Sequence, residues 1–355
     1  MRMLILSTPV APLGSGIGGG VELTIHNLAY ILQQRRHHVE ILAPKGSWLP
    51  VSSVIQIQGE LQPRAQHQNR NEKTDTPSNS VLTNMCTYAK KHQHRYDLIL
   101  SFAYDWLPLY LTSQFETPLA HFMSMSSLND ALDYELKRVA AEFPRRLGCY
   151  SKAQANTFPV PEAFTILKSG IDLSKYSYCG QPGNYHVWAG RISPEKGLED
   201  ALQATQLLKS PLKILGKLED KEYWESMCRE YPEAAVDYIG FLETGEMQKV
   251  LRKAKALLMT PHWTEAFGMV VIEAFACGVP VVSYNRGGPA EIIEPGKTGF
   301  LVEAGRTEQL AAAVGRIEQI RRSDCRRTAE KLYSLEIWGD RFEEWMQSLV
   351  KVYRV

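Results

Sequence analysis

The chain has 355 residues, of which 44% are hydrophobic and 22% charged, and its formal net charge is +1. This composition allows large buried cores and excludes a wholly disordered chain, and the length suits two domains of ordinary size. Neither half carries the basic excess expected of a nucleic-acid-binding protein. The six cysteines are scattered without a C-x-x-C pair, which predicts reduced, mostly buried residues. No apolar run approaches the ~20 residues that span a bilayer, so we expect a cytoplasmic protein without a transmembrane segment.

Short apolar runs in the first half alternate with segments of helical period. The runs predict buried parallel strands, and the segments between them predict flanking helices. The first helix is expected at 21–35, where Ile25, Leu28 and Leu32 share one face. The strands are expected at 3–7, 39–43, 98–102, 118–122, 147–150 and 164–167.

One stretch of this half, residues 58–80, is almost wholly polar. Such a composition cannot bury enough apolar surface to order itself, which predicts a mobile surface loop.

The same alternation restarts after a linker rich in Tyr, Ser, Gly and Pro at 174–184. It predicts a second buried sheet with its own helices, followed by a mainly helical segment at 306–353 and an amphipathic tail at 338–352. The second set of strands is expected at 186–189, 212–215, 236–239, 256–260 and 279–283, and its helices at 198–208 and 223–231.

A glycine-rich run lies between the first strand and the first helix and contains G-x-G-x-x-G at 14–19. Glycines at such a turn let backbone N–H groups approach a phosphate at the helix N-terminus. A nicotinamide dinucleotide site needs a tight turn and an acid near the end of the second strand, whereas six residues separate Ser7 from the first glycine and the second strand ends in Ala-Pro. We therefore favour a loop that closes over a diphosphate, through Gly18, Gly19 and Gly20, over a dinucleotide site or a merely flexible loop.

Two cations follow the first strand of the second sheet. Arg191 and Lys196 lie just before a predicted helix, beside backbone donors of its first turn. Two fixed cations there suit a leaving diphosphate, which must hold developing negative charge. The residues alone leave open that Lys196 is solvated and Arg191 pairs with a carboxylate.

Two glutamates follow in the segment 264–280. Glu265 and Glu273 are eight positions apart, which is ~12 Å along the predicted helix and comparable to the span from ribose to hexose in a nucleotide sugar. Glu265 can accept hydrogen bonds from sugar hydroxyls and Glu273 from the ribose diol, while Gly268 lets the backbone approach phosphate. The alternative is two surface glutamates, but Glu273 is flanked by apolar residues, and a buried glutamate needs partners.

These segments, with the Gly-x-Pro-Val run at 278–281 and the Gly-Gly-Pro-Ala-Glu stretch at 287–291, resemble the retaining glycosyltransferases of family 4, which have the GT-B fold. The resemblance spans the C-terminal domain and is thinner before it, at the glycine-rich run, at 104–106, at His121 and at 169–172. Ser169 stands where the family often has Asn, and Ala266 where it often has Gly. The resemblance implies an α/β protein of two Rossmann-like domains whose parallel sheets face each other across a cleft. The N-terminal acceptor-side domain would be 1–173 with the C-terminal helix at about 338–355, and the nucleotide-sugar donor domain 185–337.

The resemblance also implies roles for individual residues. Arg191 and Lys196 would bind the diphosphate, Glu265 the hexose and Glu273 the ribose. His121, expected at a strand end, would face the reacting carbon, and the base would lie near 239–242. The implied catalytic residues are His121, Glu265, Arg191 and Lys196, and the implied donor-binding residues are Gly18, Gly19, Gly20, Arg191, Lys196, Gly240, Phe241, Leu242, Glu265, Ala266, Phe267, Gly268, Met269, Val270 and Glu273.

The chain contains no D-x-D pair, the motif by which transferases of the other common fold hold Mg²⁺ or Mn²⁺ on the diphosphate. We therefore expect a metal-independent reaction that uses no cofactor. In the family, retention is thought to be a front-face displacement in which the leaving phosphate oxygen takes the acceptor proton.

Because the recognisable donor motifs lie in the second half of the chain, we assign acceptor binding by elimination to the first half. The candidates near predicted strand ends are Tyr104, Asp105, Trp106 and Met123, although each could equally belong to the core. An aromatic and methionine set with one acid suits a flat heteroaromatic such as a pterin. The opening residues and the short length are, moreover, similar to those of bacterial UDP-glucose:tetrahydrobiopterin glucosyltransferases, which implies UDP-glucose as the donor.

Rival functions remain on the same two-domain plan. They are transfer to another sugar or to a lipid, a phosphorylase or epimerase, and an inactive nucleotide-sugar-binding module. The inactive module is disfavoured because both glutamates and both cations are intact, and the lack of a basic excess argues against anionic lipid.

Overall fold

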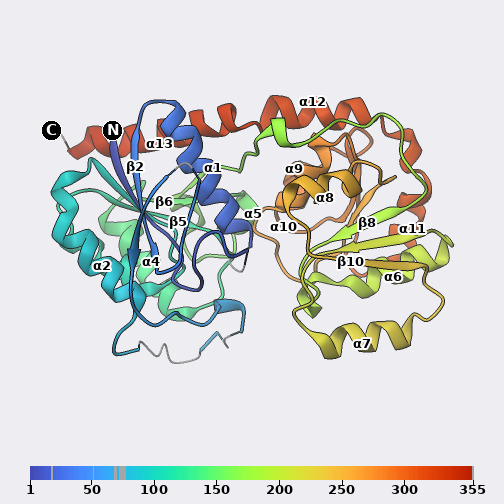
Figure 1. Ribbon diagram of the computed structural model, residues 1–355, viewed down its shortest axis with the longest axis horizontal. Helices are drawn as coiled ribbons and strands as arrows, with labels where there is room; N and C mark the ends of the chain where they lie inside the picture. Colours follow the sequence, from blue (N-terminus) through green and yellow to red (C-terminus); the bar gives the residue numbers. More distant parts are fainter. Residues whose placement is uncertain (17–18, 51, 68–69, 72–76, 354–355) are drawn as a thin grey trace. The chain divides into compact units, whose positions relative to one another are not determined.

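The computed structural model describes residues 1–16, 19–50, 52–67, 70–71 and 77–353. The chain divides into two compact units, one made of Met1–Gly170 with Leu335–Val355 and the other of Ile171–Ser334. Each unit contains one sheet of parallel strands flanked by helices, so the predicted α/β fold with two parallel sheets is confirmed (Figure 1).

The sheet of the first unit has the strand order β3-β2-β1-β4-β5-β6-β7. The order changes direction beside β1, and ligands bind at the carboxyl ends of the strands near such a point. The strands are β1 (Arg2–Leu6), β2 (His38–Pro44), β3 (Ser53–Ile57), β4 (Leu98–Ser101), β5 (Leu119–Met123), β6 (Leu147–Cys149) and β7 (Phe164–Ile166).

The sequence did not predict β3, and it gave no bounds for the helices of this unit between the first one and the C-terminal tail. The edge strand β3 is only partly buried and so lacks a continuous apolar run. The helix at 81–92 follows the N-cap Ser80, whose hydroxyl accepts from the Thr83 N–H. The helices of this unit are α1 (Gly20–Gln34), α2 (Val81–His92), α3 (Trp106–Tyr110), α4 (Asp130–Glu142), α5 (Lys152–Ala155) and α13 (Leu335–Tyr353).

The last helix of the chain, α13, packs along α1 in the first unit (Figure 1). Arg35 at the end of α1 lies 2.6 Å from Asp340 and 2.8 Å from Glu343. Beneath these ion pairs the rings of Phe122 and Phe342 are 5.5 Å apart. The C-terminal helix therefore completes the core built by the first half of the chain.

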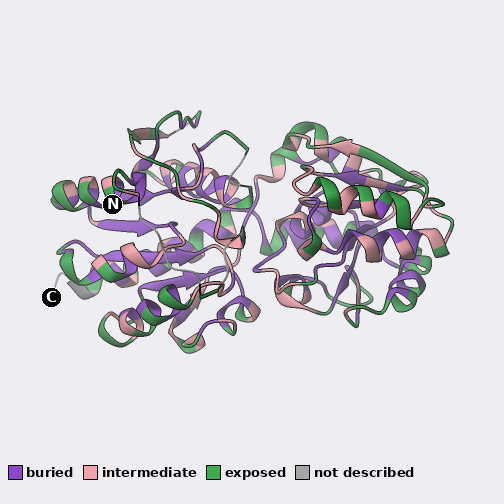
Figure 2. Cartoon of the chain, turned by 90° about the horizontal axis from the view of Figure 1, so that it is seen from below, coloured by how far each residue is buried: buried purple, intermediate pink, exposed green. Residues whose placement is uncertain are grey.

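The sheet of the second unit has the strand order β10-β9-β8-β11-β12-β13. Figure 2 shows that the strands in the middle of both sheets are buried, while the helices expose their outer faces. The strands are β8 (His186–Ala189), β9 (Leu212–Leu215), β10 (Val236–Gly240), β11 (Leu257–Met259), β12 (Val281–Tyr284) and β13 (Gly299–Val302). The helices are α6 (Leu198–Leu207), α7 (Lys221–Glu230), α8 (Thr244–Leu251), α9 (Met269–Ala276), α10 (Gly287–Ile292), α11 (Thr307–Gly315) and α12 (Arg322–Leu332).

Candidate functional site

Arg191 and Lys196 lie in the connection between β8 and α6 of the second unit. The Arg191 guanidinium is 2.5 Å from Glu219 and 2.9 Å from Glu195. The Lys196 ammonium is 2.5 Å from Oε2 of Glu265. Each cation is thus neutralised by a carboxylate of its own unit: Arg191 pairs with carboxylates, as one alternative from the sequence held, whereas Lys196 is paired and not merely solvated.

The loop that carries Lys196 ends in Gly197, which has a φ of 63°. A Cβ at this position would lie 2.0 Å from the carbonyl oxygen of Thr260, at the end of β11. Only glycine allows the connections after β8 and β11 to meet this closely. That approach brings Lys196 beside the loop of Glu265.

Glu265 lies in the loop between β11 and α9, not in the helix. The helix begins at Met269, after Gly268 in the left-handed conformation, so the predicted ~12 Å along one helix between the two glutamates is wrong. The loop is fixed by the start of α10, where the Gly288 N–H donates to the Glu265 carbonyl at 2.7 Å. A Cβ at Gly287 would lie 2.5 Å from that same oxygen, which explains the glycine pair.

Trp263 is a site residue that the sequence analysis missed. Its indole N–H donates to Oε2 of Glu265 at 3.0 Å, and the Lys196 ammonium lies 4.7 Å from the centre of its ring. Burial alone would raise the pKa of Glu265, but Lys196 and the Trp263 hydrogen bond outweigh it and hold that pKa below its usual range. The signal in the sequence was an amphipathic aromatic residue two positions before the first glutamate.

Glu273 is buried inside α9, where its Oε1 accepts a hydrogen bond from the Tyr176 hydroxyl at 2.8 Å. Burial raises the pKa of this carboxyl, and the Tyr176 hydrogen bond opposes the rise. Tyr176 was also missed, because it lies in the stretch interpreted as a linker. The apolar surroundings that the sequence predicted for Glu273 are present, and so is the partner that a buried glutamate needs.

The residues assigned to the donor follow the carboxyl ends of parallel strands and so share one edge of the second sheet. Arg191 follows β8, Glu265 follows β11, and Gly240 ends β10 with open space beside its Cα. Phe241 is 55% exposed and Leu242 half-buried. Of the remaining donor candidates, Ala266 and Phe267 are buried, and the half-buried Met269 and Val270 open α9, where N–H groups lack intrahelical partners.

The glycine-rich run of the first unit is folded onto a carboxylate of α1. The N–H groups of Gly14 and Gly16 donate to Oε2 of Glu22 at 3.0 and 3.3 Å. Two backbone N–H groups of the run that was expected to bind a phosphate therefore already donate to the carboxylate of Glu22. Gly19 and Gly20 are exposed at the start of α1, and Gly18 lies outside the described residues.

His121 lies within β5 and not at its end. Its side chain is fully buried, and its Nε2 is 2.8 Å from the Thr112 hydroxyl. Burial and the nearby Arg146 and Arg138 lower its pKa to about 3, so the imidazole is neutral. This geometry makes His121 a core residue of its unit and gives no support to contact with a sugar. The first residue beyond the end of β5 is Ser124.

The four acceptor candidates have different environments. Asp105 and Trp106 lie together after β4, where Asp105 accepts from the Leu107 N–H as the N-cap of α3 and burial raises its pKa to about 6. Trp106 is half-buried. Tyr104 is tied by its hydroxyl to the loop after β5. Met123 is fully buried in the core, so its assignment to the acceptor is wrong, because a side chain inside the sheet core cannot reach a ligand.

All six cysteines are free and four are buried, which confirms the prediction of reduced residues. Within the described ranges, no His, Cys, Asp or Glu side chains gather in a group that could hold a metal ion. Across those same ranges, no helix combines the length and apolar character needed to cross a membrane.

Comparison with known proteins points to sugar transfer. Residues 181–333 match the family model described as Glycosyl transferases group 1. A D-inositol 3-phosphate glycosyltransferase from Pseudarthrobacter chlorophenolicus is 26% identical over 366 aligned residues, which cover 85% of this chain and 83% of that one. A glycogen synthase from Mycobacterium tuberculosis is 30% identical over 161 residues, which cover 42% of this chain and only 38% of the relative.

Solved structures of glycosyltransferases share the fold over almost the whole chain. The structure of HepE from Anabaena in complex with UDP-glucose has a TM-score of 0.75 at 20% identity and covers 98% of this chain and 100% of that one. AviGT4, a glycosyltransferase of avilamycin A biosynthesis, has a TM-score of 0.73 at 17% identity and covers 99% and 98% of the two chains. At these identities the likeness establishes the fold.

Proposed function

We propose that this chain, whose residues 181–333 in the second unit match the group 1 glycosyltransferase family model, transfers glucose from UDP-glucose to a small acceptor with retention at the anomeric carbon. The observation that carries the proposal is the cluster of Lys196, Glu265 and Arg191 at one sheet edge. It combines two cations for a diphosphate with a carboxylate for sugar hydroxyls.

The proposed reaction forms a bond from the acceptor atom to the anomeric carbon while the bond from that carbon to the diphosphate oxygen breaks. Arg191 and Lys196 stabilise the negative charge that develops on the leaving diphosphate, together with the N–H groups that open α9. The leaving phosphate oxygen takes the acceptor proton. Glu265 orients the hexose and Glu273 the ribose, and no divalent metal or cofactor takes part.

UDP-glucose is the proposed donor because HepE, which shares this fold, binds UDP and glucose as well as UDP-glucose. The base would lie at the open end of β10, against the backbone of Gly240 and the exposed Phe241. Contacts of this kind, largely through backbone groups, suit a planar base.

The acceptor is proposed to be a small heteroaromatic molecule, with a pterin as the specific candidate. The support is the pair Asp105 and Trp106 after β4, which offers a carboxylate for ring N–H groups beside an aromatic face. Met123 no longer belongs to this set.

The deciding experiment measures donor turnover with and without acceptors, by mass spectrometry. Purified protein is incubated with UDP-glucose alone, and then with tetrahydrobiopterin, inositol phosphate or maltose. We expect a glucosylated pterin and release of UDP that depends on the acceptor, both abolished in Glu265→Ala. Donor turnover without acceptor would favour an epimerase, and UDP binding without any turnover would favour an inactive binding module. Calorimetry showing tighter binding of GDP than of UDP would overturn the donor assignment.

A further inference from the structure

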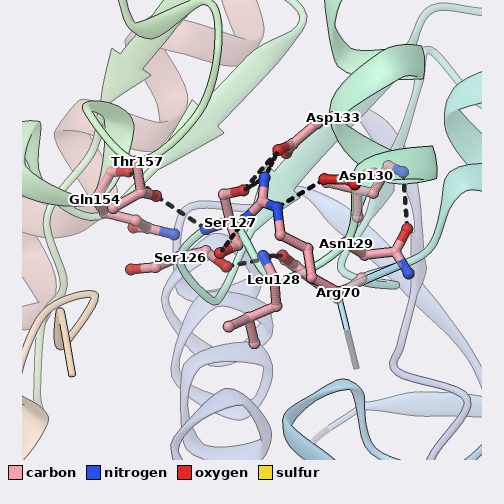
Figure 3. A network of polar contacts seen from close by, with 11 residues as sticks. Arg70, Ser126, Ser127, Leu128, Asn129, Asp130, Asp133, Gln154 and Thr157 are labelled. Atoms are coloured by element: carbon pink, nitrogen blue, oxygen red, sulfur yellow. Dashed lines mark hydrogen bonds and ion pairs between the residues drawn. The ribbon is translucent and has the colours of Figure 1, made fainter. Parts of the chain in front are cut away.

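The loop between β5 and α4, residues 124–129, is held by hydrogen bonds to several other segments of its unit (Figure 3). The Ser127 N–H donates to the Thr157 hydroxyl at 2.9 Å, and the Leu128 N–H donates to the Tyr104 hydroxyl at 2.8 Å. The loop follows the carboxyl end of β5, at the same sheet edge as the connections after β1 and β4. A loop at this position is where a ligand of the unit is expected, and this one is rigidly built.

Arg70, from the polar stretch 58–80, closes the network. Its Nε lies 2.6 Å from Asp130, and its Nη2 lies 2.5 Å from Asp133 and 3.0 Å from the Ser127 hydroxyl (Figure 3). The Ser127 hydroxyl in turn donates to Asp133 at 2.6 Å. One guanidinium thus joins the loop to the first turn of α4 through three side chains.

The buried carboxylate of Asp133 needs the Arg70 cation, so the hydrogen bonds of the loop depend on Arg70. Asp133 is only 8% exposed, and burial raises its pKa against the effect of Ser127 and Arg70. Its Oδ1 is buried without a hydrogen-bond partner in the described part of the chain. A buried carboxylate needs a nearby cation, so removal of Arg70 would leave an uncompensated charge beneath the loop.

Other described residues of the same polar stretch also reach the carboxyl edge of the sheet. The Gln62 N–H donates to the carbonyl of Pro9, after β1, and the Gln66 amide lies 2.7 Å from the sulfur of Met125, after β5. The stretch is predicted to be a mobile surface loop, and in the structure its residues Gln62, Gln66 and Arg70 make specific contacts with other segments. Their polar side chains find partners on other segments, which composition alone does not reveal.

Ser124 differs from the other polar residues of the loop. It is the first residue beyond β5, it is half-buried, and within the described residues its hydroxyl has no hydrogen-bond partner. The Ser127 hydroxyl, three positions later, is bonded to both Asp133 and Arg70. The loop therefore presents one uncommitted hydroxyl at the sheet edge and fixes its surroundings.

We propose that the Ser124 hydroxyl binds a polar group of the acceptor, and that Arg70 is a positioning residue that holds the Ser124 loop through Ser127 and Asp133. This inference rests on the proposed function and adds a specificity-determining contact to it. It gives Arg70 a role in acceptor binding, and it requires an acceptor with a hydroxyl or amide within reach of the strand end.

The test compares four variants: Ser124→Ala, Arg70→Ala, Arg70→Lys, and the double variant that combines Ser124→Ala with Arg70→Ala. Arg138→Ala is the matched control. Arg138 also pairs with two carboxylates of α4, at 2.8 and 3.0 Å, but on a later turn. We expect Ser124→Ala to raise the acceptor KM roughly three- to tenfold, as loss of one hydrogen bond does, with an unchanged donor KM. Arg70→Ala should have a similar effect, Arg70→Lys a smaller one and Arg138→Ala none.

The double variant separates a positioning role from general destabilisation. If Arg70 acts through Ser124, Arg70→Ala adds little to the acceptor KM once Ser124 is alanine. Effects that multiply, or a normal acceptor KM in Ser124→Ala, overturn the inference. Melting temperatures and UDP calorimetry are measured on every variant, and Arg70→Lys keeps the charge if Arg70→Ala folds poorly. A wild-type protein that transfers no glucose defeats the proposed function, whereas normal variants of an active enzyme defeat this inference alone.

Discussion

The Lys196 ammonium lies 2.5 Å from Oε2 of Glu265, and the Trp263 indole N–H donates to the same oxygen. The cation assigned to the diphosphate and the carboxylate assigned to the hexose therefore neutralise each other. A diphosphate would compete with Glu265 for Lys196, because both are anions that accept charge-assisted hydrogen bonds. If the diphosphate draws Lys196 away from Glu265, the Glu265 carboxylate becomes available to accept hydrogen bonds from sugar hydroxyls. Binding of the diphosphate would thus prepare the site for the hexose of the same donor.

Glu265→Gln should therefore affect turnover and nucleotide binding in opposite directions. Turnover of UDP-glucose should fall roughly tenfold to a hundredfold, since a charge-assisted hydrogen bond to the sugar is lost. UDP itself should bind about fivefold more tightly, because ~1 kcal/mol of competition for Lys196 is removed. Steady-state kinetics and UDP calorimetry check the two effects. The control is Glu246→Gln, which removes the partner of Lys249 in an exposed pair on α8 and should change neither quantity. Weaker UDP binding in Glu265→Gln would contradict the competition.

Catalysis should persist without divalent metal ions. Arg191 and Lys196 supply two positive charges where a metal would otherwise neutralise the diphosphate. We expect the same rate of UDP release in excess EDTA as in Mg²⁺ or Mn²⁺, and a loss of at least roughly tenfold in Lys196→Ala under both conditions. Activity that disappears in EDTA and returns with Mg²⁺ would show that the two cations are not sufficient.

Much of the second unit could be predicted from the sequence, because its features are local. The strands β8 and β9, for example, follow from apolar runs at 186–189 and 212–215. The partners of the charged residues could not be predicted. The pairs of Lys196 with Glu265 and of Tyr176 with Glu273 join residues 69 and 97 positions apart, and only the packed sheet brings them together.

The positions of His121 and Glu265 differ from the predicted ones for physical reasons. The predicted strand 118–122 puts His121 near a strand end, whereas β5 continues to Met123 and the Thr112 hydroxyl meets His121 Nε2 inside the core. The sequence predicts that the segment from Thr264 opens a helix directly after the preceding strand, whereas the left-handed Gly268 delays the start of α9 to Met269, and only the glycine itself marks that conformation.

Binding of the acceptor should depend on pH through Asp105. Burial raises the pKa of this carboxyl to about 6, against the hydrogen bonds from the Leu107 N–H and Gln62. Above that pH the carboxylate is ionised and can accept from a ring N–H, and below it the neutral acid binds the acceptor less well. We expect the acceptor kcat/KM to fall as the pH drops through about 6, and Asp105→Asn to give a low and nearly flat profile. Asp220→Asn, which alters the N-cap of α7 in the other unit, is the control and should keep the wild-type profile. An unchanged profile in Asp105→Asn would remove Asp105 from the acceptor site.

Nucleotide binding should depend on pH through Glu273 and its partner Tyr176. Burial raises the pKa of Glu273, and the Tyr176 hydrogen bond, 2.8 Å long, stabilises the ionised form and limits the rise. In Tyr176→Phe the pKa rises further, so the carboxylate becomes protonated at a higher pH as the solution is acidified. Because the ionised form accepts from the ribose diol, UDP affinity should begin to fall at a higher pH in this variant than in the wild type, by about one pH unit for a hydrogen bond of ~1.4 kcal/mol. Calorimetric titration with UDP between pH 5 and 8 checks the displacement. Tyr185→Phe removes a hydroxyl that donates to the carbonyl of Val250 instead of a carboxylate, and it should leave the midpoint unchanged. Identical midpoints in Tyr176→Phe and the wild type would mean that Glu273 does not bind the ribose in its ionised form.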